Sequence, residues 1–379
     1  MMRRLYYLLL VLLSGLGFWG IWVRLTEGLR ITALTSYVSW GLWVAFYIFF
    51  IGLSAGSFLL STLIYVFGMA RLERVGRLAL LSALCSLGAG MTFIMIDLGH
   101  PARFWHTLVY RNFRSVLEWE IFLYVIYAGI ILMELWLLSF SRSPKAKAWV
   151  QLLGIVGLPV AIGVHGGTGS IFALAVGRPY WNSGLLPIIF IVSALASGAA
   201  LVTFLWAILG PRDAEKPAMV RTLAQLMTLF LTIDGLLVAS EFLVGLYSGI
   251  PEEAGALIAL TERFWFVFWI GQMGFGFLVP MLLVALPATR KSTVWMGIAG
   301  ISAVVGILAV RMNLVIPAYI VPQFEGLRRA YVDARLQYSY TPNRMEWLVA
   351  MGVVAFTMLV FSVIYERVIT ERKQEVAQR

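Results

Sequence analysis

Long, nearly uncharged apolar segments follow one another along most of this chain, and they leave few folds open to it. A helix that crosses a bilayer needs about 20 consecutive, mostly apolar residues. Ten segments meet this requirement: approximately 5–25, 38–68, 77–98, 115–140, 147–174, 185–210, 218–247, 264–287, 292–316 and 345–366. With 61% hydrophobic and 13% charged residues, the chain has more apolar surface than a soluble domain can bury. We therefore predict an all-α integral membrane protein, a single membrane domain over 1–379 with about ten transmembrane helices.

The connecting loops predict how this protein lies in the membrane. None is long enough for a soluble domain, and the longest covers roughly 317–344. The first segment is too long for a signal peptide and lacks a small-residue cleavage site, so we expect it to be retained. The short loops on one side are basic: 69–76, 141–146, 211–217 and 288–291. Because basic loops stay in the cytoplasm, we predict a multi-pass protein of the cell inner membrane with both termini cytoplasmic.

Cysteine and histidine usage excludes several classes of redox centre from this chain. The single cysteine, Cys85, cannot hold an iron–sulfur cluster, which needs about four thiolates. Only three histidines exist, too few on facing helices for the axial pairs of a diheme cytochrome. We expect no haem, no iron–sulfur cluster and no metal site. The net charge of +10 indicates membrane topology, and nucleic acid is not an expected partner.

A weak internal repeat links the two halves of the chain. LSAGSFLLS at 53–61 resembles LASGAALVT at 195–203, and both segments are predicted to run in the same direction. Two residue pairs with equal 20-residue spacing add to this: Arg77 with Asp97, and Arg221 with Glu241. We predict a duplication into two parallel units. These are four-helix units at 38–174 and 185–316, with flanking helices at 5–25 and 345–366. Chance similarity between helices rich in small residues is the alternative.

Polar groups at membrane depth concentrate in the outer half. Ionisable side chains are costly there, and they usually mark function. The outer group comprises Tyr47, Asp97, Glu118, Glu120, His165, Glu241 and Arg311. Asp234 lies near the centre and Glu134 toward the inside. The hairpin 97–120 adds His100, Arg103, His106, Arg111 and Arg114, so we expect it to cover an outer pocket and to form a docking surface. A solvated loop with interfacial anchors is the alternative.

Each candidate residue also has a structural interpretation. His165, within HGGTGS, has glycine neighbours that leave space beside a ring able to exchange protons near neutral pH. It could equally be a histidine bonded to a backbone carbonyl. Asp97 could serve only as a partner of Arg103 or Arg111, and Tyr47 could serve only in packing.

Asp234 and Glu241 are seven residues apart and therefore share one helix face. With Glu134 and Arg311 they could form a proton route. The alternative is a static ion pair with Arg311.

A lipid-soluble quinone fits this set of groups. Its ring needs an apolar slot, two hydrogen-bond donors and a protonatable neighbour. We expect His165 and Asp97 to be catalytic and Tyr47 to be a second donor. Additional binding residues are expected to be Arg103, Glu118 and Glu120. Two other functions stay open: a proton or ion transporter that uses Asp234 and Glu241, and a membrane anchor without chemistry.

Four motifs in order resemble the NrfD/PsrC family of quinone-interacting membrane subunits. They are SWGLWVAFYIFFIGLSAG (39–56), DLGHPARFW (97–105), NFRSVLEWE (112–120) and RPYWNSGLLPIIFIVSALASG (178–198). The resemblance implies a bound menaquinone or ubiquinone near the outer face, with His165 at its site. It also implies a ferredoxin-like iron–sulfur partner. That partner connects to a molybdopterin enzyme, a hydrogenase, a multihaem cytochrome or a sulfite-reduction-associated subunit.

With ten predicted spans instead of eight, the chain resembles the longer branch of this family, which includes DsrP and the hydrogenase-2 membrane subunit. The segment 319–347 looks most like the outer loop of DsrP. In the shorter branch a histidine on the small-residue helix contacts quinone. Tyr47 stands at that position here, which leaves its donor role open.

Overall fold

The computed structural model describes residues 2–141, 143–322, 326–327, 333 and 335–370, and these residues form helices and loops without a β-strand. Ten helices of the described ranges are long and apolar enough to cross a membrane. They are α1 (Met2–Glu27), α2 (Leu42–Tyr65), α3 (Glu73–Asp97), α5 (Val116–Phe140), α6 (Ala146–Ala173), α7 (Leu186–Leu209), α8 (Lys216–Tyr247), η4 (Phe266–Leu278) with α10 (Val279–Ala285), α11 (Thr293–Val315) with α12 (Pro317–Ile320), and α14 (Arg344–Ile364). The prediction of an all-α, ten-span membrane protein is confirmed.

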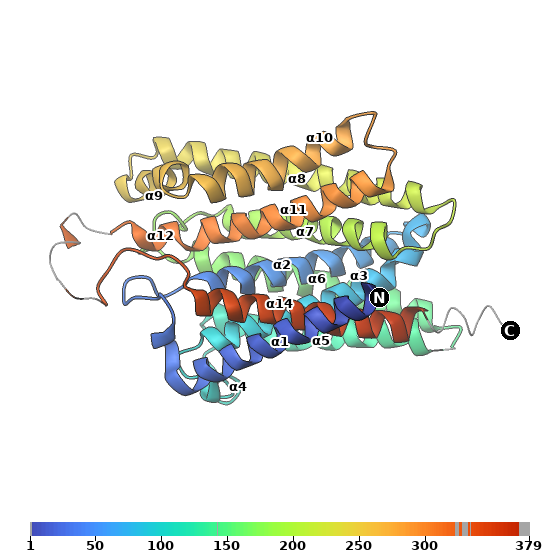
Figure 1. Cartoon of the computed structure of the whole chain (residues 1–379), viewed down its shortest axis with the longest axis horizontal. Helices are drawn as coiled ribbons and strands as arrows, with labels where there is room; N and C mark the ends of the chain where they lie inside the picture. The colour runs from blue at the N-terminus through green and yellow to red at the C-terminus, as the bar shows by residue number, and fades with distance from the viewer. Residues whose placement is uncertain (1, 142, 323–325, 328–332, 334, 371–379) are drawn as a thin grey trace.

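The two ends of the bundle differ. α1 begins and α14 ends at one end, which we call the terminal end (Figure 1). The opposite, distal end carries the 98–115 hairpin and α9 (Pro251–Glu262). The hairpin contains η3 (Pro101–Arg103) and α4 (His106–Val109). The ninth span runs on to Ile320, so the following loop is shorter than predicted, and part of the DsrP-like segment 319–347 lies outside the described residues.

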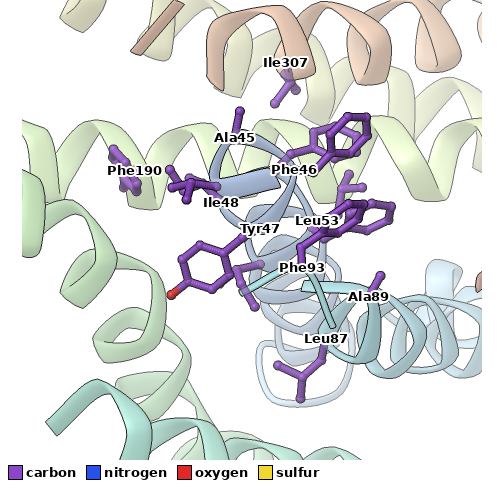
Figure 2. Close-up of a cluster of buried hydrophobic side chains, with 14 of the residues drawn as sticks. Ala45, Phe46, Tyr47, Ile48, Leu53, Leu87, Ala89, Phe93, Phe190 and Ile307 are labelled. Atoms are coloured by element: carbon purple, nitrogen blue, oxygen red, sulfur yellow. The ribbon is translucent and has the colours of Figure 1, made fainter. Parts of the chain in front are cut away.

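Helix α2 is the centre of the bundle, and the most apolar window of its sequence is fully buried. It contacts α3, α6, α7, α11 and α14. The side of α2 toward α3 is filled by aromatic rings, with Phe46 stacked on Phe93 at 5.0 Å between ring centroids (Figure 2). A helix with no lipid-facing side can carry polar residues on one face without exposing them to hydrocarbon.

The repeated small-residue segments meet at the contact between α2 and α7. A Cβ at Gly56 would lie 1.7 Å from the carbonyl oxygen of Ala194, and one at Gly198 would lie 2.0 Å from the carbonyl carbon of Gly56. Gly56 and Gly198 hold the same position in the two similar segments. Each set has matching helix contacts: α2 packs on α3 and α6, and α7 packs on α8 and α11. The duplication stays a prediction, and this packing supports it.

Candidate functional site

Four polar side chains form a buried cluster on the face of α2 that points away from the Phe46–Phe93 stack. We call Tyr47, Glu120, Tyr124 and Thr168 the Glu120 cluster. Glu120 Oε1 accepts hydrogen bonds from the Tyr124 hydroxyl at 3.0 Å, from the Tyr47 hydroxyl at 3.4 Å, and from Thr168. The hydroxyls of Tyr47 and Tyr124 are 2.7 Å apart. In Figure 2 the Tyr47 hydroxyl points toward the green helices, away from Phe93.

Helix geometry brings these residues together. Glu120 and Tyr124 are one turn apart on α5 and so share a face. Thr168 on α6 also bonds the carbonyl of Val164 at 3.0 Å, which fixes its hydroxyl against the helix. Glycines let α6 approach α7 closely, since a Cβ at Gly169 would lie 2.8 Å from Cα of Pro187. A carboxyl group with only 3% exposure therefore has hydroxyl partners from three helices.

His165 lies one turn before Thr168 on the same helix, and its ring makes no hydrogen bond with the described residues. The side chain is 1% exposed, and neither Nδ1 nor Nε2 has a partner in the described part of the chain. The ring fits beside α2 because Gly52 lacks a side chain: a Cβ there would lie 3.2 Å from Nε2. A neutral imidazole carries one donor and one acceptor, and leaving both unmade in an apolar interior costs free energy. This site is therefore suited to a hydrogen-bonding ligand.

A second polar group begins on the other side of Phe190. The Phe190 ring packs on His165 with centroids 5.1 Å apart, and the Arg311 guanidinium lies 4.7 Å from the same ring. Arg311 donates to Ser193 Oγ at 2.7 Å. The predicted ion pair with Asp234 or Glu241 is not formed at contact distance within the described residues.

The predicted proton-route residues do not form one continuous group. Glu241 accepts a hydrogen bond from Ser183 at 2.7 Å and lines a cavity of about 90 Å³ together with Arg311. Asp234 Oδ1 is buried without a hydrogen-bond partner in the described ranges. Glu134 lies at the other end of α5 from Glu120, and its Oε1 also has no partner there. The route through these residues stays a prediction.

Asp97 ends α3 on the other side of α2 from the Glu120 cluster. The cation beside it is Arg24 of α1, instead of the suggested Arg103 or Arg111. Arg24 is buried and donates to the carbonyls of Ile96 at 2.8 Å and Leu98 at 2.5 Å, so it also caps the end of α3. Asp97 Oδ1 is buried and unpartnered within the described residues. The structure thus does not join Asp97 to the Glu120 cluster by a hydrogen bond.

The two remaining predicted binding residues lie apart from the cluster. Arg103 is exposed on η3, and Glu118 is buried at the start of α5 with no hydrogen-bond partner for Oε1 among the described residues. The hairpin 98–115 is largely exposed and carries the predicted arginines at the distal end. Neither its role as a pocket lid nor the binding roles of these two residues is tested by the geometry.

Sequence reasoning missed several residues that the structure makes prominent. Tyr124 and Thr168 complete the Glu120 cluster; their spacing from Glu120 and His165 along each helix was the available signal. Arg24 is another residue that was missed, and the available signal was a charge near the end of an apolar segment. At the distal end, Glu346 accepts from Tyr340 at 2.5 Å, and burial together with this carboxylate raises the pKa of the Tyr340 hydroxyl.

Comparisons with known proteins place the whole chain in one family. The family described as "Polysulphide reductase, NrfD" matches residues 31–323. A selenate reductase subunit of Mesobacillus selenatarsenatis is 45% identical, covering 99% of this chain and 96% of its own. The Hdr-like menaquinol oxidoreductase integral membrane subunit of Archaeoglobus fulgidus is 30% identical, and the match covers 94% of this chain and 92% of the relative. The menaquinone reductase integral membrane subunit of Nitratidesulfovibrio vulgaris is 23% identical, and the match covers 93% of this chain and 88% of the relative.

Proposed function

The chain belongs to the NrfD family, and from this membership and its buried polar cluster we propose that it is the quinone-reactive membrane subunit of a respiratory oxidoreductase. Two relatives carry menaquinol or menaquinone in their names, and a third is a subunit of a selenate reductase. Menaquinone or ubiquinone, when bound, would supply two-electron chemistry coupled to two protons. The chain itself would supply the binding site and the proton exchange.

The observation that carries this proposal is the pair of unpartnered His165 nitrogens next to the Glu120 cluster. The N–H of His165 would donate to one ring carbonyl, and a hydroxyl of the cluster, from Tyr47 or Tyr124, would donate to the other. The Glu120 carboxyl group, whose Oε1 accepts from these hydroxyls, would hold the proton that the site gives or takes. Burial among apolar helices excludes water from the exchange.

The same proposal assigns the partners to the distal end. Arg103, Arg111 and Arg114 are exposed there, and they form a surface suited to a ferredoxin-like iron–sulfur subunit. That subunit would pass electrons to or from a catalytic subunit, such as a molybdopterin enzyme. With the basic loops at the terminal end in the cytoplasm, the distal end would be the outer face of the inner membrane.

Proton coupling is a second, separate part of the proposal. The 90 Å³ cavity between Glu241 and Arg311 is large enough to hold water. Asp234 lies about two turns from Glu241 on α8 and would receive a proton from this cavity. Changing Asp234 to Asn should remove proton translocation while electron transfer continues. If the wild-type protein moved ions in membranes without quinone and Asp234→Asn abolished that movement, the result would instead favour a transporter.

The quinone site is tested with His165→Ala in the purified complex. We expect quinol oxidation or quinone reduction to fall about 100-fold or more, the usual effect of losing a positioned proton-transfer group. Ser170→Ala is the matched control, because Ser170 lies on the same helix and, among the described residues, its hydroxyl bonds only the carbonyl of Gly166. Quinone affinity, measured by titration, should fall in parallel. Wild-type turnover and affinity in His165→Ala would show that the site lies elsewhere.

A further inference from the structure

An apolar groove runs along the side of the bundle between α1, α3 and α14, away from the Glu120 cluster and from Arg311. Its volume is about 400 Å³, within the range of small-ligand pockets. Its lining includes Phe18, Leu84, Cys85, Gly88 and Phe356. The groove lies within three membrane spans, so it opens toward hydrocarbon instead of water.

Small residues keep the groove open. α1 and α14 touch directly through glycine, since a Cβ at Gly17 would lie 2.4 Å from Cα of Gly352. On α3, a Cβ at Gly88 would meet no atom within 4 Å. Tight packing on one side and missing side chains on the other leave a channel that protein atoms do not fill. An unfilled apolar void of this size would forfeit dispersion contacts along its whole wall.

A cation lies beyond the groove at the terminal end. Arg77 precedes Leu84 by seven residues on α3, so both lie on one face of the helix. Arg77 is partly exposed, and in the described part of the chain it makes neither a hydrogen bond nor an ion pair. The neighbouring Arg74 is bound to Asp213 and Glu215.

The spacing along α3 matches one leaflet. From Arg77 to Thr92, the groove residue nearest the distal end of α3, the helix rises about 22 Å at ~1.5 Å per residue. Half of a bilayer with its headgroups is also about 22 Å thick. A chain lying in the groove would therefore place its headgroup at the level of Arg77.

We propose that this groove binds one acyl chain of an anionic phospholipid, whose phosphate pairs with Arg77. The bound lipid fills the space between the α1–α14 pair and α3, and it stabilises their contact. This site shares no residue with the Glu120 cluster, and its occupancy is independent of quinone chemistry.

Native mass spectrometry of the purified protein with phosphatidylglycerol or phosphatidylcholine tests the site. We expect one tightly held phosphatidylglycerol. Gly88→Phe should abolish this binding by filling the groove, whereas Gly129→Phe, at a glycine of α5 that also meets no atom within 4 Å, should retain it. Arg77→Gln should weaken phosphatidylglycerol binding about fivefold and phosphatidylcholine binding by less, because the choline cation offsets the charge of the phosphate. Equal binding by wild type and Gly88→Phe overturns the proposal.

Cys85, the only cysteine, gives a second readout because it lines the groove. Its reaction with a small apolar maleimide should be slower with phosphatidylglycerol present than after delipidation. The same rate under both conditions contradicts lipid binding. Protection by menaquinone but not by phosphatidylglycerol would show that an isoprenoid tail occupies the groove and that the phospholipid proposal is wrong.

Discussion

At the scale of single residues, the hydroxyl partners of Glu120 offer a direct comparison. Tyr124→Phe removes one hydrogen bond to Glu120 Oε1 and keeps the ring. Because a hydrogen bond to a charged group contributes about 1.5–3 kcal/mol, quinol-linked electron transfer should fall about tenfold or more. Tyr127→Phe is the control: this buried tyrosine, on the next turn of α5, bonds Ser54 at 3.2 Å and not Glu120. Equal rates for the two variants would separate the cluster from catalysis.

The electrostatic interaction of Arg24 with Asp97, which form no ion pair at contact distance within the described residues, can be measured by stability. Arg24→Met leaves two carbonyls and the Asp97 carboxyl without their cation, so we expect the free energy of unfolding to fall by about 3 kcal/mol. Asp97→Asn should lower the free energy of unfolding by less in Arg24→Met than in the wild type, and the two decreases should differ by about 1 kcal/mol or more. Thermal unfolding in detergent measures the stability of the wild type, the two single variants and the double variant. Strictly additive effects would contradict an interaction between the two side chains.

Sequence reasoning located part of the candidate site and missed part of it for a physical reason. Tyr47, Glu120 and His165 were identifiable because a polar or ionisable group in an apolar segment is costly and therefore conspicuous. Tyr124 and Thr168 are compatible with an apolar segment, and their roles depend on the rotation of α5 and α6. Asp97 carried as strong a signal as Glu120, yet it faces Arg24. Depth along a helix is readable from sequence, whereas the direction of a side chain around it is not.

At the scale of elements, hydropathy predicted the spans well, with each end within four residues of the observed α-helix or π-helix. The bilayer sets their lengths, so composition alone is sufficient. The local helix type was not predictable: η4 adopts π-helical geometry over Phe266–Leu278, and α6 continues through Pro159. Both features depend on packing with neighbouring helices that the sequence does not specify.

The contact between α2 and α7 should be the least tolerant of the helix pairs to added volume. Gly56→Val would force a side chain into the backbone of α7, so the two central helices could not stay in contact. We expect a loss of more than about 3 kcal/mol, seen as a lower unfolding temperature or as absence of folded protein. Gly129→Val, where a Cβ meets open space, should change stability by about 1 kcal/mol or less. A mild effect at Gly56 would show that the helices can separate without penalty.

At the scale of the whole molecule, the arrangement of helices decides what the polar residues can do. α2 lies between the Glu120 cluster, on the side of α5 and α6, and the Asp97 and Arg24 side chains, on the side of α1. The sequence predicted that these residues share one depth, which suggested a single pocket. The fold places the central helix between them. Only the pairing of α1 with α14 and α3, which no local pattern encodes, brings Arg24 to the end of α3.

The orientation of the molecule in the membrane remains a prediction that a labelling experiment can decide. After Cys85→Ser removes the only cysteine, Ser143→Cys places a thiol in the terminal-end loop and Tyr110→Cys places one in the exposed distal hairpin. Because basic loops are retained in the cytoplasm, a membrane-impermeant maleimide should label Tyr110→Cys in intact cells. It should label Ser143→Cys only after the cells are permeabilised. The reverse pattern would place the Glu120 cluster toward the cytoplasm, and an electron-transfer partner at the distal end would then have to be a cytoplasmic protein.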